Sequence, residues 1–170
     1  MTDLPTMRAL IAERYGAPEE LRFRDVPIPV PAGGEVRVRV SVSTVNRTDT
    51  ATLRGHPFFA RAMTGWRRPN HVIMGMEFAG EIDALGAGVD GFAVGDRVFG
   101  MSPERFGAHA EYICLSADGP VAHVSERLDL SKMVVCEGAW YANGTTQILS
   151  PGQNALIFGA SGAIGTAATQ

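Results

Sequence analysis

The 170-residue sequence predicts a mostly β domain with short helices, followed by the beginning of an α/β domain. Three observations lead to this fold class. Residues 36–42 alternate valine with arginine or serine, which is the two-residue period of a half-buried strand. Turn-forming proline and glycine recur through the first 120 residues. Near the carboxyl end, a short apolar run leads directly into a glycine-rich turn, as buried parallel strands do before a helix.

Strands and turns are expected in order through the first part of the chain. An apolar run over residues 7–14 ends at the turn Tyr15–Pro18. A half-exposed strand follows over residues 21–26 and ends at Pro27, because proline cannot donate to a strand ladder. The clearest strand is 36–42, with its valines facing the core and its arginines facing water. Glycine turns at 86–95 and 105–107 separate three further expected strands: 78–85, 97–101 and 110–116.

One short helix and one long loop are expected between these strands. The helix covers Arg47–Leu53 and is ended by Gly55 and Pro57. The loop His56–Asn70 is rich in aromatic and basic residues. It either walls or covers an apolar binding site, or it is a surface loop folded onto its own aromatic side chains.

The sequence pattern changes after Pro120. Ser131 is expected to cap a helix over residues 132–149, which Pro151 and Gly152 end. The apolar run Ala155–Phe158 is expected to be a buried strand. A domain boundary within the helix would separate residues 1–130 from residues 131–170.

Composition and charge exclude several classes of function. The 15 basic and 18 acidic residues give a net charge of −3, so the chain lacks the excess of positive charge that favours binding to nucleic acid or to an acidic membrane. No stretch approaches the roughly 18 apolar residues that a membrane span needs, and the first residues do not form a secretory signal. Cys114 and Cys136 lack the spacing of a disulfide or redox motif. We therefore expect a cytoplasmic protein without nucleic-acid or membrane partners.

The glycine turn is the first candidate binding site. Gly159, Gly162 and Gly165 follow the expected strand in a G-x-x-G-x-x-G pattern, a variant of the dinucleotide fingerprint. Glycines let backbone amides approach a pyrophosphate, and the following helix presents its positive end to that anion. The same glycines can instead serve packing alone. The candidate cofactor-binding residues are Gly159, Ser161, Gly162, Ala163, Ile164 and Gly165.

Four motifs before this turn occur in a recognisable order: Gly75–Ile82, Leu85–Val89, Val94–Val98 and Gly107–Tyr112. Together with the glycine turn, they closely resemble the medium-chain dehydrogenase/reductase superfamily over residues 7–170. The resemblance implies a GroES-like, partly open barrel that forms the catalytic domain. It also implies that the chain continues with the first β-strand, glycine turn and helix start of a Rossmann domain. The 170 residues would then be an N-terminal fragment, inactive by itself.

The residues at the superfamily's zinc positions differ from those of zinc-dependent members. Asn46 stands where the resemblance places a catalytic cysteine, and Met76 where it places a histidine. Only Cys136, at the third position, is retained. A catalytic zinc needs three protein ligands, and neither an amide nor a thioether suits it. We therefore expect no metal, and we expect Cys136 to be a small packing residue.

The resemblance to zinc-free quinone oxidoreductases and related enone reductases implies an oxidoreductase. Its cofactor would be NADPH, with NADH as the alternative, and its substrate a small apolar carbonyl or quinone. A homodimer is a further expectation, because relatives are often dimeric. Ala51 departs from the pattern, since quinone reductases often have tyrosine there. The alternative is a non-enzymatic binding or scaffold protein on the same fold.

The candidate catalytic residues are Asn46, Asp49 and Tyr141. Asn46 either donates a hydrogen bond to the substrate oxygen or holds the turn after the valine strand. Asp49 is expected to cap or orient the short helix rather than transfer protons. Tyr141 either lines the nicotinamide pocket or belongs to a core. Glu77 lies in an apolar segment, where a carboxylate needs a hydrogen-bonding or charged partner, and it is expected to support the former metal position. His109 and His123 are isolated histidines, and no special role is expected for either.

Overall fold

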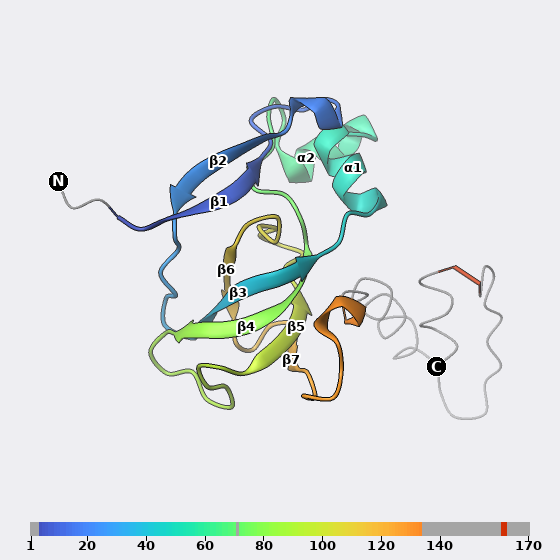
Figure 1. The fold of residues 1–170 in the computed structure, drawn as a ribbon. Coiled ribbons are helices and arrows are strands. Elements are labelled where there is room, and N and C mark those ends of the chain that lie inside the picture. Colours follow the sequence, from blue (N-terminus) through green and yellow to red (C-terminus); the bar gives the residue numbers. More distant parts are fainter. Residues whose placement is uncertain (1–3, 71, 134–160, 163–170) are drawn as a thin grey trace. The chain divides into compact units, whose positions relative to one another are not determined.

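The computed structural model describes residues 4–70, 72–133 and 161–162 (Figure 1). The chain divides into two compact units, Met1–Val134 and Val135–Gln170. The expected helix beyond residue 133 and the expected strand over residues 155–158 lie outside the described residues. That the second unit begins a cofactor-binding domain therefore stays a prediction.

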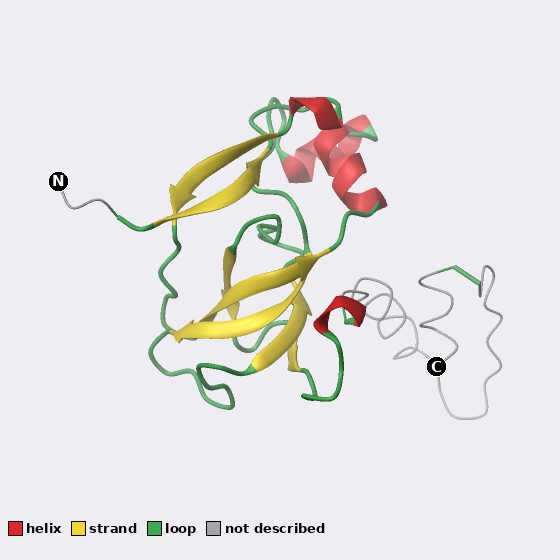
Figure 2. Ribbon diagram, viewed as in Figure 1, coloured by secondary structure: helices red, strands yellow, loops and turns green. Residues whose placement is uncertain are grey.

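A five-stranded antiparallel sheet forms the centre of the first unit, in the order β6-β3-β4-β5-β7 (Figure 2). Its two ends, β6 and β7, do not pair with each other, so the sheet is open rather than closed into a complete barrel. The strands are β3 (Glu35–Ser43), β4 (Glu77–Leu85), β5 (Arg97–Met101), β6 (Tyr112–Ser116) and β7 (Val121–His123).

The four strands that the sequence predicts in this sheet are confirmed within one or two residues. Strand β7 was not predicted, because its three residues are too few to show an alternating pattern. It joins the sheet through pairing with β5, where Phe99 lies opposite Ala122. The partner strand β5 lies about twenty residues earlier in the chain, so the sequence around β7 gives no signal for this pairing.

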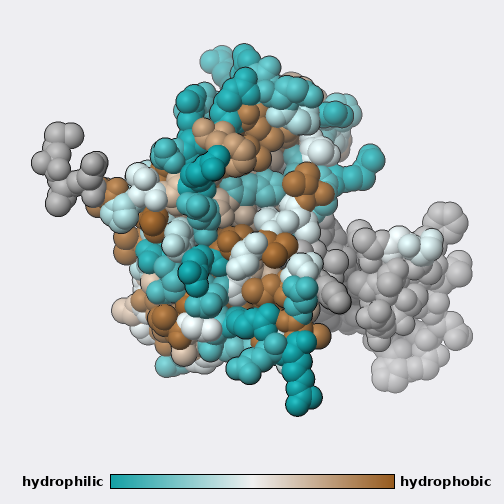
Figure 3. Space-filling model, in the orientation of Figure 1, coloured by the Kyte–Doolittle hydropathy of each residue, from teal (hydrophilic) through white to brown (hydrophobic). Residues whose placement is uncertain are grey.

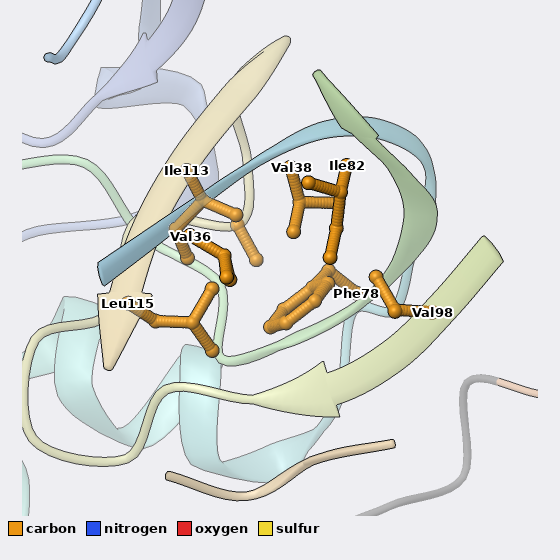
Figure 4. Close-up of a cluster of buried hydrophobic side chains, with 8 residues drawn as sticks. Val36, Val38, Phe78, Ile82, Val98, Ile113 and Leu115 are labelled. Atoms are coloured by element: carbon orange, nitrogen blue, oxygen red, sulfur yellow. The ribbon is translucent and has the colours of Figure 1, made fainter. Parts of the chain in front are cut away.

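Alternate side chains of β3, β4, β5 and β6 build the core (Figure 4). Its buried members are Val36, Val38, Phe78, Ile82, Val98, Ala108, Ile113 and Leu115, all at most 4% exposed. The expected core face of β3 is thus confirmed. The expectation that its arginines face water holds for Arg39 but is wrong for Arg37, which is half-buried. Arg37 forms a paired hydrogen bond with Asp83 on the neighbouring strand, at 2.8 and 3.0 Å.

Strands β1 (Thr6–Ile11) and β2 (Arg22–Pro27) form a separate antiparallel pair, with the 3₁₀ helix η1 (Pro18–Glu20) between them. The expectation of a half-exposed strand is wrong for β2, since almost all of it is exposed and the Phe23 side chain is 65% exposed. The reason is that, among the described strands, β2 pairs only with β1, whereas β1 also bridges to other segments, for example Ala9 to Ala110.

The predicted short helix is confirmed as α1 (Arg47–Arg54). Gly55 ends it in the left-handed conformation, with φ of 57°, which glycine adopts without strain. The predicted loop after it is wrong in part, because the structure contains the 3₁₀ helix η2 (Phe58–Ala60) and the four-residue helix α2 (Arg61–Thr64). Helices this short carry no periodic signal in the sequence. In the described ranges, no helix is long and apolar enough to cross a membrane.

This helical segment is folded onto its own aromatic rings. The Arg61 guanidinium lies over the rings of Tyr15 and Phe58, at 4.4 and 5.1 Å from their centres. The ring of Phe58 meets Trp66 edge-on at 5.4 Å. Stacking of a planar guanidinium on an aromatic face is favourable, so these contacts order the segment without a buried core of its own.

Near the end of the described segment, Leu130–Lys132 form the 3₁₀ helix η3. Ser131 does not cap a helix there, because it lies within η3, and its backbone amide donates to the Asp129 carboxylate at 2.9 Å. Asp129 is therefore the capping residue.

Burial raises the pKa of the Cys114 thiol to about 11, from an ordinary value of 9.0. Because the thiolate is the reactive form, we expect iodoacetamide to label Cys114 about 100-fold more slowly at pH 8 than an ordinary thiol. The measurement is the labelling rate in a Cys136→Ser variant, followed by mass spectrometry. Labelling in urea is the control and should proceed at the rate of a free thiol; fast labelling of the folded chain would contradict this prediction.

Candidate functional site

The candidate site begins where β3 ends and α1 starts (Figure 1). Asn46 caps α1: its side-chain oxygen accepts from the backbone amides of Thr48, at 2.8 Å, and Asp49, at 3.3 Å. The Asp49 carboxylate in turn accepts from the Asn46 amide at 2.9 Å. This reciprocal capping box satisfies amides that have no partner within the helix. Asn46 thus holds the turn, and Asp49 orients the helix.

Glu77, at the start of β4, supports this turn from below. Its carboxylate is 4% exposed and accepts hydrogen bonds from the Thr44 hydroxyl and, at 3.5 Å, from the Asn46 amide nitrogen. The Ser43 hydroxyl donates to the Glu77 carbonyl at 2.7 Å. These bonds supply the partners that a buried carboxylate needs. They also fix the plane of the Asn46 amide.

His109 is a site residue that reasoning from the sequence missed. Its Nε2 lies 2.7 Å from the Thr44 carbonyl oxygen. A carbonyl only accepts, so Nε2 carries the proton. Gly75 makes room for the ring: its φ is +85°, and a Cβ there would lie 2.4 Å from His109 Cδ2. Two signals in the sequence pointed to it: the glycine that begins the Gly75–Glu77 motif, and the place of His109 within the Gly107–Tyr112 motif.

Asp49 is buried, and its environment changes its ionisation. Loss of solvent raises its pKa above the ordinary value of 3.8, while the backbone amide of Asn46 and the charge of His109 act in the opposite direction. Among the described residues, Asp49 Oδ1 and His109 Nδ1 are buried without a hydrogen-bond partner. Burial is the largest of these effects, and the negative charge of Glu77 raises the pKa of Asp49 further.

Asp49→Asn is expected to remove part of the pH dependence of stability. A carboxyl group whose pKa is raised on folding favours the folded state only while protonated, so its contribution is lost as pH rises above 3.8. Asparagine keeps the acceptor for the Asn46 amide but cannot ionise. Urea unfolding at about pH 4.5 and pH 7 should therefore show a smaller loss of stability in the variant. Asp90→Asn, at an exposed position, is the control, and an equal loss in Asp49→Asn and wild type would contradict the prediction.

A cleft of about 760 Å³ runs along the outer face of α1. The helix contributes Arg47, Thr48, Thr50, Ala51, Thr52 and Arg54 to the lining. The spacing of three, four and seven residues puts Arg47, Thr50, Ala51 and Arg54 on one face of the helix. Opposite them lie the segment Gly55–Pro57 and Thr64. The lining therefore combines cationic and hydroxyl groups, and the small side chain of Ala51 occupies its middle.

Residues 32–126 match the alcohol dehydrogenase GroES-like domain family. The chain is also 34% identical to the quinone oxidoreductase of Lama guanicoe over 171 residues, which cover 96% of this chain and 48% of that protein. The chain belongs to the medium-chain dehydrogenase/reductase superfamily, in its quinone oxidoreductase-like branch. It spans about half the length of the curated relatives it matches.

Solved structures of the superfamily have the same fold. The quinone oxidoreductase of Coxiella burnetii has a TM-score of 0.77 and 26% identity, covering 96% of this chain and 52% of its own. An alcohol dehydrogenase superfamily protein from Novosphingobium aromaticivorans has a TM-score of 0.79 and 30% identity, covering 96% and 49%. The GroES-like, partly open barrel is thus confirmed for this superfamily member.

Several predicted site residues of this superfamily member lie outside the described residues: Cys136, Tyr141, Gly159, Ala163, Ile164 and Gly165. Ser161 and Gly162 are described and form an exposed turn. Met76, at a zinc position of relatives, is buried at 5% exposure. No group of three or more histidine, cysteine, aspartate or glutamate residues that would hold a metal ion occurs within the described ranges.

Proposed function

We propose that the whole protein is a zinc-independent, NAD(P)H-dependent reductase that transfers hydride to a quinone or an α,β-unsaturated carbonyl. The observation that carries this proposal is the similarity to quinone oxidoreductases along 96% of the chain. The cleft beside the Asn46 turn supports it, because it offers space for a small acceptor. The whole protein is proposed to be cytoplasmic and a homodimer, without nucleic-acid or membrane partners. The net charge of −3 over these 170 residues supports only the absence of such partners, because it gives no excess of positive charge.

The glycine turn Gly159–Gly165 would hold the pyrophosphate of the cofactor. The exposed turn at Ser161 and Gly162 fits this role, because backbone amides in such a turn can face an anion. NADPH is the proposed cofactor, with NADH as the alternative, and Tyr141 would line its nicotinamide pocket. When bound, the nicotinamide supplies the hydride. The protein supplies the position and polarity of the acceptor.

Asn46 is the proposed polarising residue. Its side-chain oxygen is engaged by two backbone amides, and one hydrogen of its amide nitrogen is directed to Glu77. The second amide hydrogen is left for the acceptor oxygen, where a fixed donor stabilises the negative charge that develops during hydride transfer. Glu77 orients this amide, and Asp49 holds the helix that carries the turn.

The donor set supports chemistry without zinc. The Asn46 oxygen already accepts two hydrogen bonds, so it is poorly suited to coordinate a metal. The thioether of Met76 prefers softer metals than zinc. Polarisation of the acceptor therefore depends on hydrogen bonding rather than on a Lewis acid.

The test is NADPH oxidation by the whole protein with 1,4-naphthoquinone and with trans-2-hexenal, followed at the nicotinamide absorbance band. Turnover with either acceptor, unaffected by 1,10-phenanthroline, would support the proposal. Calorimetry with NADPH and NADH identifies the cofactor. A folded protein that binds neither nucleotide would overturn the proposal and favour a non-enzymatic scaffold on this fold.

A further inference from the structure

The α1 cleft carries positive charge that hydride transfer itself does not require. Arg47 and Arg54 are seven residues apart, so they project from the same helix face, about 10 Å apart along the axis. Both are exposed, and neither belongs to an ion pair within the described part of the chain. His56, on the opposite wall, adds a group that becomes cationic when protonated.

Among the residues that the structure describes, no acidic side chain lines this cleft to neutralise the arginines. The one acidic residue of α1, Asp49, is buried on another face of the helix and is used in the capping box. The local charge is therefore opposite in sign to the net charge of −3. Hydrophilic residues predominate at the end of the unit that carries α1 and α2 (Figure 3).

The guanidinium groups, rather than the hydroxyl groups of the lining, suit an anion. The Thr50 hydroxyl donates to the Arg47 carbonyl at 2.9 Å, and the Thr64 hydroxyl bonds with the Tyr15 hydroxyl at 2.9 Å, so both hydroxyl protons are already used within the chain. Ala51 lies between the arginines on the same face, and its small side chain leaves room for a ligand group there. Guanidinium groups present paired donors that match the geometry of carboxylate and phosphate oxygens.

We propose that the α1 cleft binds an acceptor that bears an anionic group, a carboxylate or a phosphate, which Arg47 and Arg54 recognise. This inference rests on the proposed reductase function and narrows its substrate class. The reducible carbonyl would point toward Asn46 at the start of α1, and the anionic group would lie along the helix face. An apolar quinone without charge would leave both arginines unused.

The first test measures binding without turnover. The probes are 4-oxo-2-pentenoate and its methyl ester, which share a carbon skeleton and differ by one charge. Each is titrated into the ¹⁵N-labelled 170-residue chain at low salt, and chemical shifts of α1 amides and arginine Nε–H groups are followed by NMR. The acid should bind about tenfold more tightly than the ester, with shifts at Arg47 and Arg54. Equal affinity, or shifts that avoid α1, would overturn the proposal.

Matched variants separate a built site from a general positive field. Arg47→Gln combined with Arg54→Gln should abolish the preference for the acid. Arg67→Gln combined with Arg68→Gln removes the same charge from exposed positions that do not line the cleft, and should keep the preference. An equal loss in both double variants would show a non-specific charge effect and overturn the proposal.

The second test uses the whole protein and separates this inference from the proposed function. The Arg47/Arg54 variant should raise KM for the acid about tenfold and leave KM for the ester and for NADPH unchanged. A rise in KM for NADPH alone would mean that the arginines bind the phosphates of the cofactor rather than the acceptor, and would overturn the proposal. Binding of the acid without any turnover would support the anion site and reject the reductase. Equal turnover of acid and ester, unchanged in the variant, would keep the reductase and reject the anion site.

Discussion

Phe78→Ala is expected to lower the free energy of unfolding by about 3–5 kcal/mol. Phe78 has no exposed surface and lies at the centre of the core, among residues of β3, β5 and β6 (Figure 4). Alanine removes the ring and leaves a cavity that the surrounding strands cannot close. The loss is a large part of the about 5–15 kcal/mol by which domains are usually stable. Urea unfolding followed by tryptophan fluorescence measures it.

Phe59→Ala is the matched control for this prediction. Phe59 is 78% exposed, so the same change in chemistry removes little buried surface. Its effect is expected to lie within about 0.5 kcal/mol of wild type. Similar losses in the two variants would mean that the core is not centred on β4.

Asn46→Ser in the whole protein is expected to lower kcat about 100-fold while keeping the cap of α1, with a loss of about 1 kcal/mol in stability for the bond to Glu77. Serine is as good a helix cap as asparagine, because its hydroxyl accepts from the same backbone amides. It lacks the amide hydrogen that we propose for the acceptor oxygen. Steady-state kinetics with 1,4-naphthoquinone, together with a thermal unfolding curve, separate the two effects.

Asn46→Ala supplies the comparison, because it removes both the cap and the donor. It should show the same loss of kcat and an additional loss of about 0.5–2 kcal/mol in stability. If Asn46→Ser retains full activity, Asn46 serves α1 alone. The polarising donor would then have to come from another residue.

Local patterns predicted the elements whose physical cause lies within a few residues. The valine alternation of β3 reports which side of the strand is buried, because side chains point to opposite faces in turn. The end of α1 at Gly55 follows from the left-handed conformation that glycine permits. The expected roles of Asn46 and Asp49 at the start of α1 also rest on local spacing, because a capping box joins residues three positions apart.

Local sequence patterns could not predict contacts between residues that lie far apart in the sequence. His109 bonds to the Thr44 carbonyl across 65 positions of sequence, and Glu77 accepts from Asn46 across 31. Arg37 is half-buried beside Asp83 on β4, and β2 is exposed as a strand that, in the described ranges, pairs with β1 alone. In each case the deciding partner is set by the packing of the sheet.

The sequence by itself determined the family, the strands and helix that show periodicity or caps, and the residue types at the former metal positions. Only the tertiary structure decided which polar groups meet: the support of Asn46 by Glu77, the place of His109 against Gly75, and the position of Thr64 across the cleft from α1. The physical reason is that periodicity and capping are local properties of the backbone. Hydrogen bonds and clefts depend on which distant segments the hydrophobic core brings together.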